Sequence, residues 1–112
     1  MPKSYRSSLA KFRCGVAPIR VETGRYENIP FDERLCDNCN VVETEAHCLL
    51  ECYLYDDIRH ELLEQAREVF SDFDNFLMSE KLSVILSDTR LCFTSAKICN
   101  LILSRRKLLT YL

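Results

Sequence analysis

The stretch that runs from Cys36 to Cys52 reads CDNCNVVETEAHCLLEC. Two cysteines separated by two residues place both sulfur atoms within reach of one small ion. With one histidine and a third cysteine they complete a tetrahedral ligand set for a structural zinc ion. No coordination position is then left for water, so the pattern indicates a structural metal and not a catalytic one. The sequence therefore predicts zinc bound by Cys36, Cys39, His47 and Cys52.

Cys48, beside His47, offers an alternative ligand. In an uninterrupted helix over residues 45–52, Cys48 and Cys52 share one face and His47 lies off it. A site of four cysteines, with Cys48 in place of His47, is therefore the alternative. Binding by His47 requires the helix to loosen before Cys52, and Cys48 is then a core residue. Free cysteine is also an ordinary core residue, so four unrelated positions form a third interpretation.

Length and composition predict one domain, or a fragment of a larger protein. The chain has 112 residues, of which 47% are hydrophobic and 29% charged, as in globular proteins and unlike disordered ones. Only two glycines and three prolines favour helices. The N-terminus lacks the apolar core of a signal peptide, and no apolar run is long enough to span a membrane. The number of cysteines, seven, is odd, which does not suit a framework of disulfides. We therefore expect an intracellular protein, with the nucleus as one candidate location, whose thiols bind metal.

The net charge of −2 conceals a strong partition along the chain. Residues 1–35 carry a net +3, residues 36–90 a net −9 and residues 91–112 a net +4. Basic segments can contact the phosphates of nucleic acid, or they can pair with the acidic middle of the same chain. If nucleic acid binds, the expected contacts are Lys3, Arg6, Lys11, Arg13, Arg20 and Arg25, joined by the basic triplet at 105–107.

The spacing of apolar residues predicts several helices. Their expected ranges are 4–12, a short one at 46–50, 56 or 57 to 70, 80–87, and from Thr94 or Ser95 into the C-terminal region. Thr44 is expected to cap the short helix and Ser79 the helix over 80–87. Residues 19–35 are expected to be irregular, with a turn at residues 23–25.

These elements predict a mainly α fold class: a small irregular zinc-stapled helical domain with a zinc knuckle followed by a three-helix segment. Residues 1–63 are expected to form a basic arm and zinc-knuckle module. Residues 64–112 are expected to form a helical C-terminal extension packed on it, within one domain overall.

The sequence gives no support for catalysis. Asp56 and Asp57 are adjacent, but their place at a helix start is explained by capping. His60 lies alone on a polar helix face and is expected to be exposed. No phosphate loop, nucleotide fingerprint or hydrolase elbow occurs. We therefore expect no enzyme activity, no catalytic residue and no small-molecule substrate.

With these residues in view, the chain resembles the zinc-binding region that follows the reverse transcriptase in many non-LTR retrotransposons. The likeness spans about residues 8–63. It is carried by Leu9-Ala10-Lys11-Phe12-Arg13-Cys14-Gly15, Pro18, Glu22-Thr23-Gly24-Arg25-Tyr26, Pro30, Arg34, Cys36, Cys39, Glu43, His47, Cys52, Tyr55 and Arg59. The resemblance implies a module associated with nucleic acid, with Cys36, Cys39, His47 and Cys52 as its zinc ligands. It implies no catalytic residue, because polymerase and endonuclease modules are absent from these 112 residues.

Two classes of function follow. The first is a structural-zinc module that binds RNA or DNA, with zinc as its only cofactor and a retrotransposon reverse transcriptase as its origin. The second is a zinc-stabilised protein-interaction module, in which the zinc only holds the fold and the partners include other parts of a larger polyprotein. In this second class the chain can also be an inactive fragment of a retroelement. The acidic middle of the chain favours the second class, because like charges repel phosphate.

Overall fold

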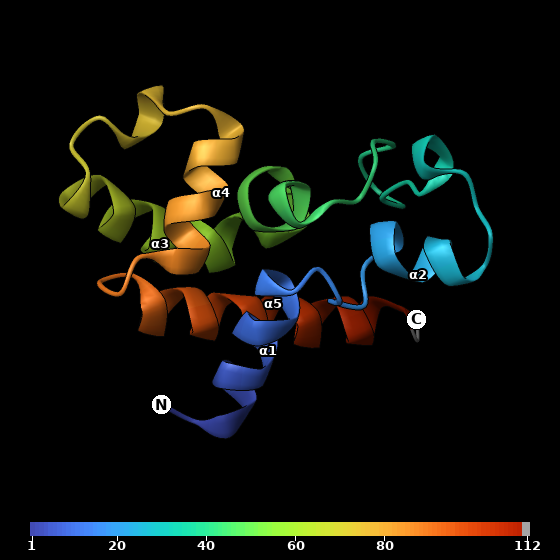
Figure 1. The fold of residues 1–112 in the computed structure, drawn as a ribbon, viewed down its shortest axis with the longest axis horizontal. Helices are drawn as coiled ribbons and strands as arrows, with labels where there is room; N and C mark the ends of the chain where they lie inside the picture. The colour runs from blue at the N-terminus through green and yellow to red at the C-terminus, as the bar shows by residue number, and fades with distance from the viewer. Residues whose placement is uncertain (111–112) are drawn as a thin grey trace.

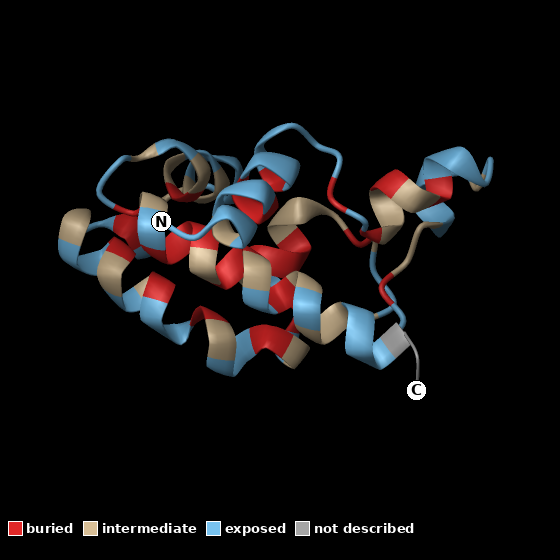
Figure 2. Ribbon diagram, turned by 90° about the horizontal axis from the view of Figure 1, so that it is seen from below, coloured by how far each residue is buried: buried red, intermediate tan, exposed pale blue. Residues whose placement is uncertain are grey.

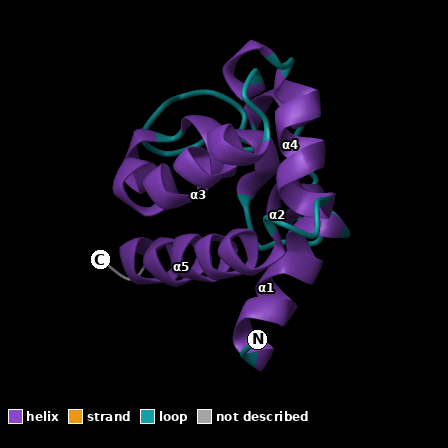
Figure 3. Cartoon of the chain, turned by 90° about the vertical axis from the view of Figure 1, so that its left-hand side faces the viewer, coloured by secondary structure: helices purple, strands orange, loops and turns teal. Residues whose placement is uncertain are grey.

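Helix α5 is the element on which most of the others pack. A computed structural model describes residues 1–110 (Figure 1). Its α-helices are α1 Lys3–Arg13, α2 Arg20–Tyr26, α3 Asp56–Val69, α4 Met78–Ser87 and α5 Cys92–Thr110. Helices α1, α3 and α4 and the turn His47–Glu51 all contact α5. Within the described range there are helices and loops but no strand, as Figure 3 shows.

The apolar character of α5 explains its central position. Ile98, Cys99 and Ile102 are almost completely buried along it, and the apolar residues of a helix are stable in the fold only when other elements cover them. Buried residues are concentrated where α5 meets its neighbours (Figure 2). The hydroxyl of Ser95 donates a hydrogen bond of 2.7 Å to the carbonyl of Ile85, which joins α5 to α4. The core therefore depends on the C-terminal part of the sequence.

Helix α1 crosses α5 and ties the N-terminus to this core. Leu9 and Phe12 of α1 are buried. The Ser8 hydroxyl donates to Oδ1 of Asn100 at 3.0 Å, and Tyr5 packs edge-on against Phe93 with ring centroids 5.9 Å apart. The basic arm is thus a helix packed on the C-terminal segment.

The mainly α fold class, with a knuckle followed by the three helices α3, α4 and α5, is confirmed. Two capping details differ from the expectation. Ser79 lies inside α4, and the carboxylate of Glu80 accepts the backbone N–H of Leu77 at 3.2 Å instead. Helix α5 begins at Cys92, before Thr94 and Ser95, which are both buried.

The expected module boundary at residue 63 falls inside α3, which is continuous from Asp56 to Val69. The last two residues of the expected extension, 111–112, lie outside the described residues. No helix in the described part of the chain is both long and apolar enough to cross a membrane.

The irregular arm expected over residues 19–35 is wrong in part, because Arg20–Tyr26 form α2. The expected turn at residues 23–25 lies within this helix. A glycine is needed at position 24 because the Arg34 side chain occupies the space that a Cβ would fill. A Cβ on Gly24 would lie 2.6 Å from Cγ of Arg34. The glycine therefore marks a close approach between α2 and Arg34, and not a turn.

Replacing Gly24 with alanine is expected to destabilise the protein by about 1–3 kcal/mol, because overpacking displaces Arg34. That side chain cannot move freely, since it donates to the carbonyls of Ile29 at 2.8 Å and Val21 at 3.0 Å. In an Arg34→Ala background the same Gly24→Ala change should stabilise α2 by about 0.5–1 kcal/mol. Urea unfolding of the four proteins checks this reversal of sign. Equal effects in both backgrounds would show that the close approach does not matter.

Candidate metal centre

The first half of the site is a tight turn that presents Cys36 and Cys39. An isolated bridge between Leu35 and Val42 closes the loop behind it. The N–H of Cys36 donates to the carbonyl of Val41 at 2.7 Å, and the N–H of Asn40 donates to the carbonyl of Cys36 at 3.1 Å. Asn40 has φ of 58°, a left-handed conformation that asparagine adopts more readily than most residues. These bonds define the turn that presents the two cysteines.

The second half is a helical turn that presents His47 and Cys52. The Thr44 hydroxyl oxygen accepts the N–H of His47 at 3.1 Å, so Thr44 caps this turn as expected. Residues His47–Glu51 form a π-turn, and the N–H of Cys52 donates to the carbonyl of His47 at 2.7 Å. In a π-turn the N–H bonds to the carbonyl five residues earlier, instead of four, which widens the helix. The loosening of the helix before Cys52 is therefore confirmed, and it brings both side chains to one side.

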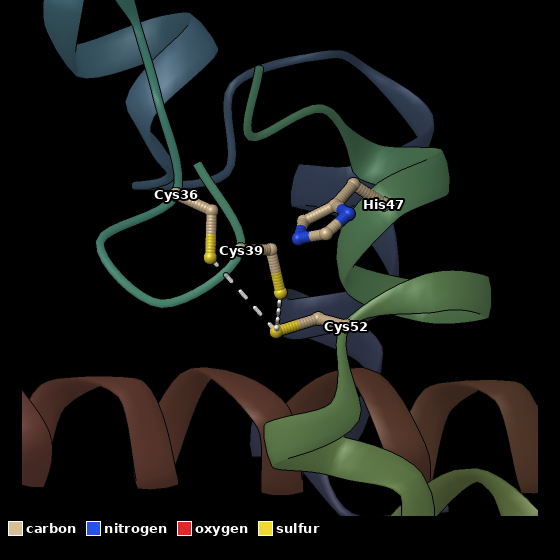
Figure 4. A group of neighbouring side chains, drawn as sticks. All are labelled: Cys36, Cys39, His47 and Cys52. Carbon is tan, nitrogen blue, oxygen red and sulfur yellow. Dashed lines mark hydrogen bonds between the residues drawn. The ribbon is translucent and has the colours of Figure 1, made fainter. Parts of the chain in front are cut away.

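The four ligand atoms converge. Those of Cys36, Cys39, His47 and Cys52 all lie within 4.8 Å of one another. The Sγ atom of Cys52 is 3.9 Å from each of the other two sulfurs. Tetrahedral zinc with Zn–S bonds of about 2.3 Å holds its sulfur ligands about 3.8 Å apart. Figure 4 shows the sulfurs and the imidazole directed toward one another from the loop and the helical turn.

The burial of the cluster suits a closed site. Cys36, His47 and Cys52 are buried and Cys39 is half-buried. All seven cysteines lie within the described residues, and none of them forms a disulfide. The sulfurs are therefore available as ligands.

The Nε2 atom of His47 is buried and has no hydrogen-bond partner among residues 1–110. A buried polar atom without a partner is costly and calls for an explanation, such as an ion. Burial lowers the pKa of His47, which favours the neutral imidazole that coordinates metals. Burial also raises the pKa of the Cys52 thiol to about 12, so deprotonation of this thiol requires a cation nearby.

Cys48, the alternative ligand, lies outside the cluster. It is fully buried and packs in the hydrophobic core. Burial raises the pKa of its thiol, as expected of an inert core cysteine. The structure thus brings together the ligand set that contains His47, and leaves Cys48 in the role of a core residue.

Replacing His47 with alanine is expected to lower zinc affinity sharply, whereas Cys48→Ala should keep the metal and cost about 1 kcal/mol of core packing. The reason is that only His47 directs a ligand atom toward the three sulfurs. Competition with a chromogenic chelator measures both affinities. Loss of the metal in Cys48→Ala but not in His47→Ala would establish the four-cysteine site.

No family model, curated protein or solved structure matches the chain.

The basic residues expected to contact nucleic acid fall into two groups. Arg20 pairs with Asp37 at 2.9 Å, and Arg25 pairs with Glu22 at 2.8 Å. Arg13 donates to the carbonyl of Leu86. By contrast, Lys3, Arg6 and Lys11 are exposed on α1, and none of them forms an ion pair within the described part of the chain.

Two of the basic residues near the C-terminus pair with the acidic middle. Arg105 contacts Asp57 at 2.7 Å, and Arg106 contacts Glu43 at 2.7 Å. Glu43 is buried, and its carboxylate also accepts the backbone N–H of Arg20 at 2.6 Å. The loop between the ligands is thereby tied to α2 and α5. His60 is exposed, as expected, and lies 2.9 Å from Glu64.

Sequence reasoning missed the structural role of Arg59. The residues buried on α3 are Arg59, Leu62 and Ala66. The i, i+3, i+7 spacing of these three residues was the available signal. A charged residue on a buried stripe is rare unless it is paired.

Proposed function

We propose that the chain is a non-catalytic module whose fold is held by one structural zinc ion. The observation that carries this proposal is the buried Nε2 of His47, which has no hydrogen-bond partner in the described part of the chain and lies beside three sulfurs at the spacing of tetrahedral ligands. Three thiolates and an imidazole suit zinc and leave no position for water or substrate. The ion would join the loop of Cys36 and Cys39 to the turn that leads into α3.

Elemental analysis of protein purified without added zinc tests this proposal. We expect one zinc per chain in the wild type and in His60→Ala, which removes the other, exposed histidine. A double variant, Cys36→Ser with Cys52→Ser, should contain none. A wild-type protein that contains no metal, or a metal that survives the double substitution, would contradict the proposal.

We further propose that this module binds the backbone of single-stranded nucleic acid, as expected of a zinc-binding region associated with a retrotransposon reverse transcriptase. The support is the exposed basic face of α1, formed by Lys3, Arg6 and Lys11. A groove of about 490 Å³ between α1 and α5 is lined by Lys11 and Lys107, so it joins the two basic ends of the chain. Exposed lysine and arginine side chains in such an arrangement suit phosphate contacts.

The second candidate is a protein-interaction module. The chain could fill this role even if it is a fragment of a retroelement that no longer copies nucleic acid. It is favoured by the internal pairing of Arg20, Arg25 and Arg106, which leaves fewer cations for phosphate. Exposed Leu101 and Leu108 flank a second groove between α3 and α5 and add apolar surface. Zinc would serve the fold equally in both cases.

Reversing Lys3, Arg6 and Lys11 to glutamate is expected to weaken binding of single-stranded RNA or DNA at least tenfold, with zinc content unchanged. Loss of three phosphate contacts should also reduce the slope of log affinity against log salt by about 2. The matched control reverses Arg67, Arg90 and Lys97, which lie outside the expected contact set and are already paired within the chain. Fluorescence anisotropy at several salt concentrations measures both quantities. Equal affinities for the two triple variants, or no binding by the wild type, would favour the interaction module.

A further inference from the structure

Arg59 reaches from α3 to the edge of the metal centre. Its side chain is 3% exposed. The Nη2 group donates to the carbonyl of Cys48 at 3.0 Å and also to the carbonyl of Cys52. Carbonyls at the end of a helical turn lack partners within that turn. Arg59 therefore supplies the donors that hold the end of the π-turn, from which the Cys52 ligand projects.

Among the described residues, Arg59 has no buried carboxylate partner. Its ion pair is with Asp56 at 2.8 Å, but the Asp56 side chain is 67% exposed. Water screens such a pair, so it compensates poorly for a buried cation. The Nε atom of Arg59 is buried and has no hydrogen-bond partner in the described residues. Burial lowers the pKa of the Arg59 guanidinium, and negative charge on Asp56 or on ionised Cys52, Cys48 and Cys39 opposes that shift.

The proposed metal centre has the charge that Arg59 requires. Three thiolates, a neutral imidazole and a divalent ion sum to −1, buried together with the guanidinium. Buried charges are stable when they are paired. The cation on α3 and the anionic centre therefore balance each other.

We propose that Arg59 is the positioning residue of this centre and its counter-charge, holding the π-turn through two carbonyls and neutralising the anionic cluster of ligands. This inference rests on the proposed zinc site. It assigns to Arg59 a contribution to metal affinity that has two parts, one from the hydrogen bonds and one from the charge. The two parts are separable by substitution.

The test compares zinc affinity, by chelator competition, among the wild type, Arg59→Lys, Arg59→Met and Arg59→Gln. We expect Arg59→Met to bind zinc about 10–100-fold more weakly, the loss typical of residues that orient metal ligands. Arg59→Lys keeps the charge and should recover part of this loss, whereas Arg59→Gln keeps N–H donors without the charge and should bind more weakly than Arg59→Lys. The matched control is Arg67→Met, which removes an exposed arginine from the same helix and should stay within twofold of the wild type.

A cobalt spectrum adds a readout of geometry. In Arg59→Lys the cobalt-loaded protein should retain the ligand-field bands of the wild type, which would show that the ligand set is intact. If Arg59→Met does not fold in excess zinc, Arg59→Lys and Arg59→Gln decide the question. Equal affinities for Arg59→Lys and Arg59→Gln would overturn the counter-charge. Affinities within twofold of the wild type for all variants would overturn the inference while the zinc site stands, and a wild type without metal would overturn both.

Discussion

Cys52→Ser is expected to abolish tight zinc binding and to unfold the region around residues 30–60. Cys52 Sγ lies 3.9 Å from the sulfurs of Cys36 and Cys39, so its loss removes one of the two ligands that connect the loop to the helical turn. In small zinc domains the free energy of metal binding is largely free energy of folding, and its apparent value at neutral pH is about 10–16 kcal/mol. Circular dichroism and amide hydrogen exchange, with zinc content measured on the same samples, check this result.

The matched control for this substitution is Cys14→Ser, which removes an exposed thiol. It should leave zinc content, the spectrum and the exchange pattern unchanged. Removal of zinc from the wild type with a chelator should reproduce the effect of Cys52→Ser. If Cys52→Ser keeps both its zinc and its protection from exchange, Cys52 is not a ligand.

Glu43→Gln is expected to destabilise the zinc-loaded protein by about 3 kcal/mol. The Glu43 carboxylate accepts from Nη2 of Arg106 at 2.7 Å and from the backbone N–H of Arg20 at 2.6 Å, and its side chain is only 6% exposed. Removing one partner of a buried ion pair costs about 3–5 kcal/mol when the pair is fully buried. We take the low end of that range because the Arg106 side chain is 20% exposed. Urea unfolding in the presence of zinc measures the change.

Asp37→Asn is the matched control, because Asp37 also pairs with Arg20 but its side chain is 73% exposed. An exposed pair contributes little, so the expected loss is below about 0.5 kcal/mol. Equal effects from the two substitutions would show that the Glu43–Arg106 pair does not couple the ligand loop to α5.

The candidate metal centre was predictable from local spacing, because a tight turn and a short helix fix where four nearby side chains lie. The spacing of His47 and Cys52 also predicted the loosened turn, since no regular α-helix presents residues five apart on one side. The spacing within residues 36–52 thus predicted which side chains converge.

Helix α2 was not predictable in this way. Its seven residues are too few to be stable alone, and Gly24 weakens it further. Its support comes from outside the segment: Arg34 packs on Gly24, and the Glu43 carboxylate accepts the N–H of Arg20. Contacts with residues outside the helix thus decided the local structure, which no pattern within residues 20–26 could show.

The pairing of charges was only half predictable. The partition into basic ends and an acidic middle allowed internal pairs, and among the described residues there are four between these segments: Arg20–Asp37, Lys97–Glu61, Arg105–Asp57 and Arg106–Glu43. Which cations stay exposed depends on how α1 packs against α5, because Leu9 and Phe12 face the core while Lys3, Arg6 and Lys11 face outward. That face of α1 is what the salt-dependence experiment addresses.

X-ray absorption spectroscopy at the zinc edge tests the metal centre most directly. For the purified protein we expect three sulfur ligands at about 2.3 Å and one nitrogen ligand at about 2.0–2.1 Å. The nitrogen ligand should disappear in His47→Ala and persist in Cys48→Ala. A first shell of four sulfurs would replace His47 with Cys48, and a shell dominated by oxygen, or protein without zinc, would contradict the proposed site.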